Sequence, residues 1–256
     1  MDGTEQRVAL VTGGGRGIGK GIALGLAEDG LDVAITYRKG KEAADETVAE
    51  IEAMGRAALA VQGDVSVPDD NERNVAEVIE RFGGFHVLVN NGGIASRGRT
   101  VADTDPEELQ RVMATHALGP HHLFSVAVPH LRTHDRADVV CISSVATLSH
   151  GANGAPYSMG KAAVESLALT LAKEERANGI RVNIVAPGLV ETEMGRRLVK
   201  GATNIDDIRS LDATMPFGRV CQPEDIANAV RFFVSDKAGY VTGEKLNVWG
   251  GGQAWR

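Results

Sequence analysis

Cysteine and long apolar runs are scarce in this sequence. Its 256 residues include two cysteines, Cys141 and Cys221, too few for a disulfide framework and typical of a reducing compartment. No run of about 18 apolar residues is present, so no membrane-spanning helix is expected. The opening stretch MDGTEQR also lacks the apolar core of a secretory signal. These absences predict a cytoplasmic protein with no membrane partner.

Positive charge is in deficit as well. Lysine and arginine number 27 against 34 aspartate and glutamate residues, which gives a formal net charge of −7. A chain this acidic lacks the broad positive field that nucleic-acid binding requires, so nucleic acid is excluded as a partner. The length suits one α/β domain, and no linker, repeat or low-complexity tract divides the chain. We therefore expect a single domain over residues 1–256.

Short apolar runs alternate with longer segments of helical period along the chain. The runs are rich in β-branched residues and continuous, as expected for strands buried on both faces. They cover residues 7–12, 31–37, 57–62, 86–90, 137–143, 180–186 and 245–249. Strict alternation of strand and helix predicts an α/β fold, with a doubly wound parallel sheet of about seven strands and helices on both faces.

One segment, 189–221, follows a predicted strand without strand or strong helix patterning. A long, weakly patterned segment at the end of a strand is typical of a lid over a site. Its larger apolar residues either line a substrate pocket or pack the lid against the domain. These residues are Met194, Leu198, Met215 and Phe217.

The stretch TGGGRGIG, residues 12–19, joins the first predicted strand to the first predicted helix. Glycines there allow a tight turn and a close approach to a pyrophosphate, and the helix N-terminus adds free N–H groups. Alone, such a loop can be only a tight turn, but its place in a βαβ pattern favours a dinucleotide site and a Rossmann-type fold. The predicted contacts are Gly13, Gly15, Arg16, Gly17, Ile18 and Gly19.

Basic residues follow the second predicted strand, where a protein that selects NAD carries Asp or Glu. Arg38 and Lys39 stand at this point, and Arg16 in the glycine loop adds a third positive charge. A 2′-phosphate is attracted by these cations and would be repelled by a carboxylate. The alternative is a solvated basic turn. The charges favour NADP(H) as the cofactor over NAD(H), with Arg38 as a predicted contact.

Five further motifs follow in order: GDV at 63–65, NNGG at 90–93, ISS at 142–144, YSMGK at 157–161 and PGLVET at 187–192. With the glycine loop, they resemble the motifs of the short-chain dehydrogenase/reductase family, and most closely those of its 3-oxoacyl-(acyl carrier protein) reductases. The resemblance implies a homotetramer, with helices around 106–131 and 155–178 at one interface and the C-terminal strand at another. It also implies cofactor contacts at Asp64, Val65, Asn91, Gly92, Pro187, Gly188, Val190 and Thr192.

The YSMGK motif places Tyr157 and Lys161 four residues apart, on one face of a predicted helix. Such pairs also arise by chance. Carbonyl reduction requires a proton donor and stabilisation of the developing oxyanion. We expect Tyr157 to be the acid and Lys161 to lower its pKa. The resemblance implies that Tyr157 and Lys161 are both cofactor contacts as well, and that Lys161 holds the nicotinamide ribose. Ser144 would bond the substrate oxygen, because the family's 13-residue serine-to-tyrosine spacing selects it over Ser143.

His116 is the main departure from the family's catalytic set. The family has an asparagine there, whose backbone carbonyl holds a water that links the lysine to solvent. Three readings stay open: a tolerated substitution, a histidine proton relay, and a weakened or inactive enzyme. The relay is open because histidine titrates near neutrality. Trp249 is a smaller departure, at a position where the family often has aspartate.

The predicted function is hydride transfer between NADP(H) and a small-molecule carbonyl or secondary alcohol, most like reduction of a 3-oxoacyl thioester. The first alternative is a sugar or polyol dehydrogenase of the same family. The second is a weakly catalytic or non-catalytic nucleotide-binding protein, which His116 keeps open. No metal site is predicted, because His130 and His134 lack the glutamate of a His-Glu-x-x-His motif and no cysteine pair supports one.

Overall fold

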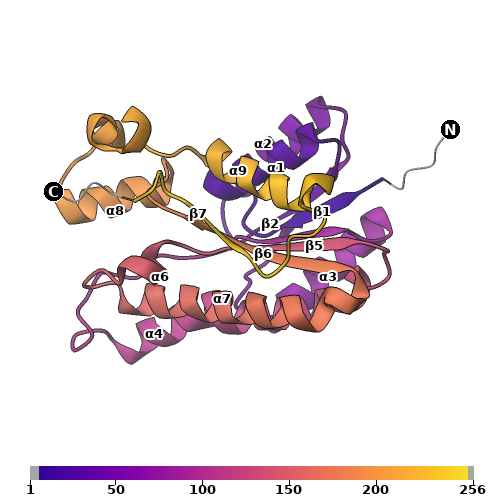
Figure 1. Ribbon diagram of the computed structural model, residues 1–256, viewed down its shortest axis with the longest axis horizontal. Helices are drawn as coiled ribbons and strands as arrows, with labels where there is room; N and C mark the ends of the chain where they lie inside the picture. Colours follow the sequence, from indigo (N-terminus) through magenta and orange to yellow (C-terminus); the bar gives the residue numbers. More distant parts are fainter. Residues whose placement is uncertain (1–5, 253–256) are drawn as a thin grey trace.

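Seven parallel strands form one sheet in the order β3-β2-β1-β4-β5-β6-β7 (Figure 1). The computed structural model describes residues 6–252, so residues 1–5, on which the expectation of no signal peptide mostly falls, lie outside it. The strands are β1 Val8–Val11, β2 Asp32–Tyr37, β3 Ala58–Gln62, β4 Val87–Asn90, β5 Ala137–Ile142, β6 Ile180–Pro187 and β7 Lys245–Val248. The predicted doubly wound parallel sheet is confirmed, with its order reversing between β1 and β4.

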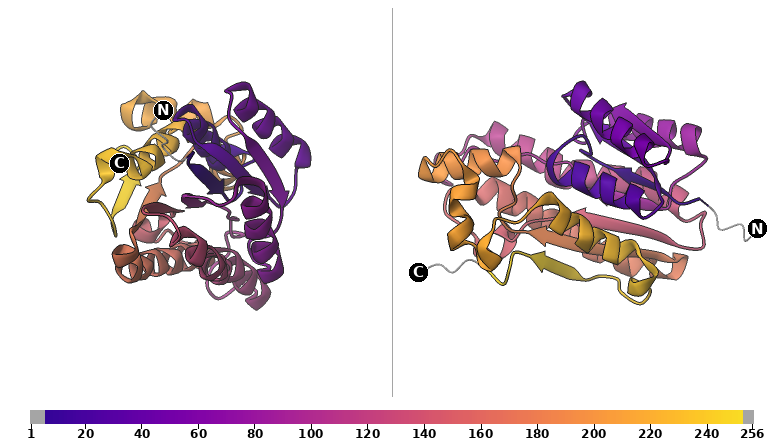
Figure 2. Two further views of the ribbon diagram at one scale, coloured as in Figure 1. Left: turned by 90° about the vertical axis from the view of Figure 1, so that its right-hand side faces the viewer. Right: turned by 90° about the horizontal axis from the view of Figure 1, so that it is seen from above.

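Helices cover both faces of the sheet. They are α1 Gly17–Glu28, α2 Lys41–Ala53, α3 Pro68–Phe82, α4 Pro106–Met113, α5 Gly119–Leu131, α6 Ala146–Ser149, α7 Ala155–Glu175, α8 Glu193–Thr203 and α9 Pro223–Val234. Helices α1, α2 and α9 lie on one face, and α3, α4, α5 and α7 on the other (Figures 1 and 2). Within residues 6–252, no helix combines the length and the apolar character needed to cross a membrane.

Each face of the sheet has its own apolar core. On one side Val11 of β1 packs in a cluster with Ile22 of α1 and other residues of α2 and α9. On the other side Leu10, its neighbour in the strand, packs with Leu123 of α5 and residues of α3 and α7. Successive strand residues point to opposite faces, so a strand with a core on both sides must be apolar throughout. This is why the strands read as continuous apolar runs.

The helix expected over 106–131 is interrupted. The chain between α4 and α5 forms a π-helical turn, Ala114–Leu118, in which the N–H of Gly119 bonds the carbonyl of Ala114. Pro120 follows, and proline has no N–H to donate to the carbonyl of His116 four residues earlier. The wider turn therefore lies where Pro120 removes one helical hydrogen bond, and it contains His116. Single π-turns of this kind are frequent at functional sites.

The segment 189–221 is more ordered than its sequence predicts. It contains α8 and two 3-10 turns, Ile208–Thr214 and Pro216–Gly218. A small apolar cluster of its own, built on Val199, Ile208 and Val220, holds it together, and Met215 packs against this cluster. The other larger apolar residues, Met194, Leu198 and Phe217, are exposed. Of the two roles left open by the sequence, packing thus applies to Met215.

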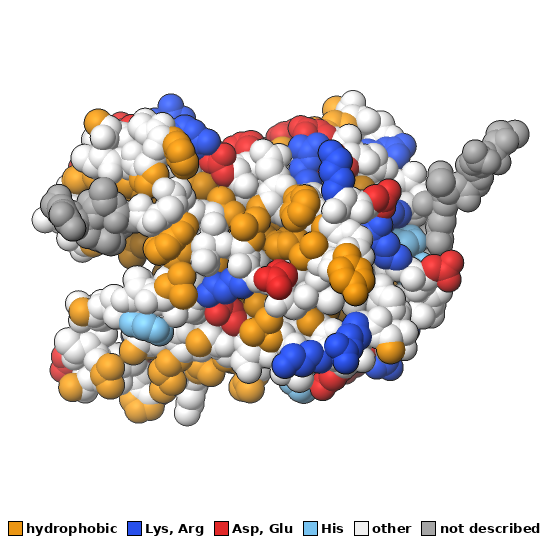
Figure 3. All heavy atoms as spheres, in the orientation of Figure 1, with side chains coloured by type: hydrophobic (Ala, Val, Ile, Leu, Met, Phe, Trp, Pro, Cys, Tyr) orange, Lys and Arg blue, Asp and Glu red, His pale blue; other side chains and the backbone are white. Residues whose placement is uncertain are grey.

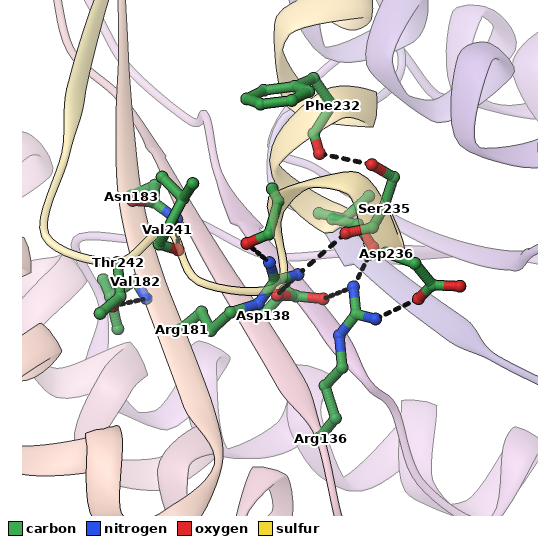
Figure 4. A network of polar contacts seen from close by, with 12 residues as sticks. Arg136, Asp138, Arg181, Val182, Asn183, Phe232, Ser235, Asp236, Val241 and Thr242 are labelled. Carbon is green, nitrogen blue, oxygen red and sulfur yellow. Dashed lines mark hydrogen bonds and ion pairs between the residues drawn. The ribbon is translucent and has the colours of Figure 1, made fainter.

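Asp138 of β5 is buried at the amino end of the sheet. Arg7, Arg136 and Arg181 lie 2.8, 3.5 and 2.6 Å from its carboxylate. Figure 4 shows Arg136 and Arg181 beside Asp138. The three arginines donate to backbone carbonyls at and just beyond the end of α9, on Val234, Ser235 and Ala238. Burial raises the pKa of Asp138, and the three guanidinium groups oppose that rise. The cluster fastens the last helix to the strands beneath it.

Candidate active site

The motifs meet at the carboxyl edge of the sheet. Thr12 follows β1, Asn91 follows β4, Ser144 comes shortly after β5, and Gly188 follows β6. In a parallel sheet these ends share one edge, and ligands bind where the strand order reverses. Figure 3 shows this side of the molecule indented between the segment that contains α8 and the turn around α6. The glycine loop and the catalytic candidates therefore face the same region.

The glycine loop forms a cradle at the N-terminus of α1. Gly13 has a φ of +66°, a conformation that strains other residues. A Cβ on Gly19 would lie 2.2 Å from the carbonyl oxygen of Gly13, so the loop closes this tightly only with glycine there. The first N–H groups of α1 have no partner within the helix, and the positive end of its dipole faces the cradle. These features fit a phosphate of a dinucleotide.

Thr12 fastens this loop to the chain after β4. Its hydroxyl accepts hydrogen bonds from the backbone N–H groups of Asn91 and Gly92, both at 2.9 Å, and the Asn91 amide donates to the carbonyl of Thr12 at 2.9 Å. Asn91, predicted as a cofactor contact, thus uses its side chain within the protein. Val65 lies against Gly92, within 3.7 Å of where a Cβ would be. Sequence reasoning missed Thr12, although it directly precedes the first glycine.

The PGLVET segment lies against the glycine loop. A Cβ on Gly17 would be 3.3 Å from Cγ2 of Thr192, whose hydroxyl caps α8 by accepting from the N–H of Gly195 at 3.0 Å. Arg16 pairs with Glu193 of α8 at 2.6 Å and does not line the cavity beside Arg38. Predicted cofactor residues from the two ends of the chain are thereby brought together, whereas Arg16 faces α8.

Pro187, Gly188 and Val190 continue this segment from the end of β6. A Cβ on Gly188 would lie 2.9 Å from Cβ of Trp249, and Val190 is buried. The carbonyl of Pro187 accepts from the N–H of Val145, next to Ser144, at 3.0 Å. The departure at Trp249 thus sits directly behind Gly188, and the PGLVET segment is bonded to the serine loop.

A cavity of about 260 Å³ opens at the end of β2. It is lined by Arg38, Gln62, Gly63, Asp64, Asp70 and Arg73. Arg38 lies 3.3 Å from Asp64, and Arg73 donates to the carbonyl of Gln62 at 2.9 Å. Burial raises the pKa of Asp64, but hydrogen bonds from Ser66 and Arg38 outweigh burial and hold the pKa below its usual value. Arg73 escaped the sequence reading because only the packing of α3 on β3 brings it here.

Tyr157 and Lys161 lie on α7, and Ser144 lies beside them after β5. Lys161 is 5% exposed, and its ammonium donates to the carbonyl of Ile142 at 2.7 Å. Burial lowers the pKa of Lys161 to about 8, opposed by the charges of Cys141 and Glu165. Ser144 accepts from the N–H of Ala146 at 3.2 Å, and its hydroxyl also makes a hydrogen bond with the phenol of Tyr157. The predicted trio is brought together at one edge.

The pKa of Tyr157 differs from the expectation. Burial raises it, and a hydrogen bond with Ser144 opposes the rise. The ammonium of Lys161 lies over the tyrosine ring, 5.8 Å from its centroid. The predicted lowering by Lys161 is therefore wrong for this structure, because desolvation of the phenolate dominates. A phenol that stays protonated suits a proton donor better than a base.

His116 is buried between two glycines. A Cβ on Gly93 would lie 2.7 Å from Cε1 of the imidazole, and one on Gly160 would lie 2.8 Å from its Cβ. The ring meets Tyr157 edge-on, with centroids 5.4 Å apart. Burial and then the charge of Lys161 lower the pKa of His116 to about 3. The imidazole is thus neutral at ordinary pH, which argues against the proton relay that the sequence left open.

The imidazole of His116 faces a backbone that it cannot fully satisfy. Its Nε2 lies 3.2 Å from the N–H of Ile94 and 2.8 Å from the carbonyl of the same residue. A neutral imidazole nitrogen either accepts or donates, so one of these two groups is left without its bond. An asparagine carboxamide has both an acceptor and a donor and can satisfy both.

We therefore expect different costs for two substitutions of His116. His116→Ala should lower the free energy of unfolding by about 2–4 kcal/mol, since it opens a cavity and leaves both groups of Ile94 unpaired. His116→Asn should cost less than about 1 kcal/mol, because the bond gained offsets the volume lost. Urea unfolding of the two variants measures the difference. Equal losses would mean that the Ile94 bonds contribute nothing.

Histidine clusters do not form a metal site in the described chain. His134 stacks on His86, with centroids 3.9 Å apart, and His122 lies 3.6 Å from Glu72. No group of three or more His, Cys, Asp or Glu side chains among residues 6–252 is arranged to hold a metal ion.

Known proteins share these features along nearly the whole chain. The family model described as Enoyl-(Acyl carrier protein) reductase matches residues 13–253. The chain is 37% identical to the 3-oxoacyl-(acyl-carrier-protein) reductase FabG of Staphylococcus aureus, covering 95% of this chain and 96% of the relative. It is 36% identical to the L-rhamnose 1-dehydrogenase (NAD(P)(+)) of a Sphingomonas species, with 96% of each covered. The crystal structure of levodione reductase matches with a TM-score of 0.90 at 27% identity, covering 96% of both chains. The chain belongs to the short-chain dehydrogenase/reductase family.

Proposed function

We propose that this protein is an NADP(H)-dependent reductase of a carbonyl compound, most like an enzyme that reduces a 3-oxoacyl thioester to the 3-hydroxy compound. The observation that carries the proposal is the grouping of Ser144, Tyr157 and Lys161 at the sheet edge that also holds the glycine cradle. The 3-oxoacyl reductase of Staphylococcus aureus supports the choice of substrate class.

Tyr157 donates the proton to the carbonyl oxygen in this proposal. Burial raises the pKa of its phenol, so the proton is present at neutral pH. Ser144, whose hydroxyl bonds the phenol of Tyr157 in this structure, would donate its O–H to the same oxygen and stabilise the charge that develops there. Lys161 keeps positive charge behind the tyrosine ring, and its remaining N–H groups are available to a ribose hydroxyl. The nicotinamide, when bound, supplies the hydride.

The cofactor would be held by groups that follow three strands, β1, β2 and β3. The cradle formed by Gly13, Gly17 and Gly19 takes the pyrophosphate, and Asp64 and Val65 border the adenine. Arg38, half exposed at the mouth of its cavity, takes the 2′-phosphate. The segment 189–221 would then cover the substrate, with its exposed apolar residues toward an acyl chain.

A sugar dehydrogenase is the second candidate. The L-rhamnose 1-dehydrogenase of Sphingomonas is as similar to this chain as the acyl reductases are, within one per cent identity of the Staphylococcus relative. The same Ser144, Tyr157 and Lys161 would serve both directions, since the donor in reduction is the acceptor in oxidation. The third possibility, a nucleotide-binding protein with little catalysis, is favoured by nothing in the site other than His116.

A cofactor consumption assay separates these functions. NADPH and NADH are followed with an acetoacetyl thioester and a panel of small ketones, and NADP⁺ and NAD⁺ with L-rhamnose and a polyol. We expect NADPH-dependent reduction of the thioester. Turnover of the sugar without the thioester would support the second candidate. Measurable NADPH binding with no turnover of any compound would support the third.

Arg38→Gln should change the preference between the two cofactors. A charge-assisted bond to a phosphate contributes about 1.5–3 kcal/mol, so we expect KM for NADPH to rise by about 10- to 100-fold. KM for NADH should change by less than about twofold, because NADH has no 2′-phosphate. Arg56→Gln is the matched control, because Arg56 precedes the amino end of β3 and so lies at the opposite edge of the sheet from Arg38. A wild-type enzyme that uses NADH as well as NADPH would contradict the assignment of Arg38.

A further inference from the structure

The loop that carries Ser144 is hydrogen-bonded to the carboxylate of Glu165 on α7. Ser143, 3% exposed, points away from its neighbour and donates its hydroxyl to Oε1 of Glu165. Thr147, on the other side of Ser144, lies 2.9 Å from the same oxygen. The hydroxyl of Thr147 is also 2.9 Å from the carbonyl of Ser144 itself. Oε1 of Glu165 thus contacts a residue before Ser144 in the chain and a residue after it.

Glu165 belongs to the same stripe of α7 as the catalytic candidates. Tyr157, Lys161 and Glu165 follow one another at intervals of four residues, so their side chains lie along one face of the helix. Lys161 donates a hydrogen bond to the carbonyl of Ile142, and Glu165 contacts the hydroxyls of Ser143 and Thr147. The helix therefore fixes the chain after β5 at successive points, with Ser144 in between.

Lys245 of β7 completes the group. Its ammonium lies 2.7 Å from Oε1 of Glu165 and 2.7 Å from the hydroxyl of Thr147. Both charged side chains are largely shielded, at 21% and 15% exposure. An ion pair this shielded, whose carboxylate also accepts hydroxyl bonds, is held in one geometry more firmly than an exposed pair.

We propose that Glu165 is a positioning residue for the hydride-transfer site, which holds Ser144 in place through Ser143 and Thr147, with Lys245 as its counter-ion. The proposal rests on the function proposed above. It assigns the last strand, far from the motifs in sequence, a part in shaping the site.

The charge of Glu165 also acts on Lys161, which supports a role in the site. The carboxylate of Glu165 raises the pKa of Lys161, against the larger lowering caused by burial. Glutamine at this position would keep the shape, remove the charge, and replace one acceptor oxygen by an N–H donor. Glu165→Gln should therefore loosen the hydroxyl contacts and make Lys161 easier to deprotonate.

Kinetics across pH test this role in the full-length protein. For Glu165→Gln we expect kcat of NADPH-dependent reduction to fall by about 10- to 100-fold, the loss typical of a misplaced catalytic group, with KM for NADPH nearly unchanged. The alkaline limb of the pH profile should move to lower pH. Glu165→Asp should recover part of the rate. Glu174→Gln, an exposed glutamate on the same helix, is the matched control and should behave as the wild type.

Lys245→Met should lower kcat in the same direction but by less. The double variant Glu165→Gln, Lys245→Met should lose less than the product of the two single losses, because the two residues act through one contact. A Glu165→Gln variant with wild-type kcat and an unshifted pH profile would overturn the proposal. So would a variant whose only change is a lower melting temperature.

Hydrogen exchange makes the test independent of turnover. If the wild type reduces no compound, the proposed function has failed, but the positioning claim can still be judged from backbone amides 144–149. Glu165→Gln should speed exchange there and leave β1 and β2 unchanged, since these lie outside the contact. Unchanged exchange at 144–149 would overturn the claim whatever the activity.

Discussion

Tyr157→Phe should lower kcat for NADPH-dependent reduction by about 10²- to 10⁴-fold, the range attributed to a single general acid. The phenyl ring keeps the edge contact with His116 and the position over Lys161 but has no proton to give. Affinity for NADPH, measured by fluorescence titration, should stay within about twofold, because the glycine cradle does not involve the phenol.

The rate of reduction by the wild type should also depend on pH. Burial raises the pKa of Tyr157 and lowers that of Lys161 to about 8, so both groups hold their protons at neutral pH. Reduction should therefore fall as pH rises through the range in which these protons are lost. Tyr240→Phe, whose ring is fully exposed, is the matched control. Substantial turnover in Tyr157→Phe would show that another group donates the proton.

Asp138→Asn should cost about 3–5 kcal/mol of unfolding free energy, the loss expected when one partner of a buried ionic cluster is removed. The substitution keeps the size of the side chain and removes the only carboxylate that Arg7, Arg136 and Arg181 share in the described cluster. Arg181 is itself buried, and the substitution would remove the carboxylate with which it pairs at 2.6 Å. Urea unfolding monitored by circular dichroism measures the loss.

Asp236→Asn is the comparison for this prediction. Asp236 also pairs with Arg136, but its side chain is 97% exposed, and exposed pairs contribute about 0–1 kcal/mol. A loss below about 1 kcal/mol for Asp138→Asn as well would mean that water or rearranged arginines replace the carboxylate. Added salt should affect the Asp236 pair more than the buried one.

The sheet could be predicted because most of its strands are continuous apolar runs in the sequence. Most of them are apolar on both faces, β7 at the sheet edge being the clearest exception, and each is separated from the next by a helix, which favours a parallel sheet. The Asp138 cluster could not be predicted in the same way. Asp138 and Arg181 oppose each other in register on adjacent strands, and Arg7 reaches them from two strands away. Only the strand order makes neighbours of residues so distant in the chain.

In the candidate site, too, some features could be predicted from the sequence and others depend on the folded structure. The four-residue spacing of Tyr157 and Lys161 is enough to place them on one helix face, and the glycine pattern is enough to place the cradle. The direction of the tyrosine pKa depends instead on burial, which no spacing reveals. Glu165 had a signal in the sequence, since it continues the stripe by one more turn. Its partner Lys245 had none, because β7 takes its place only when the sheet is complete.

The packing of His116 also restricts the order in which this site can change. While the imidazole is present, a methyl group on Gly93 would meet Cε1 at 2.7 Å, so Gly93→Ala should be harmful. Asparagine has no such atom, and the same alanine should become tolerable after His116→Asn. The two steps are then accessible in one order and blocked in the other. The histidine thus makes position 93 depend on position 116, and alanine at 93 is expected to be accepted only once the imidazole has been removed.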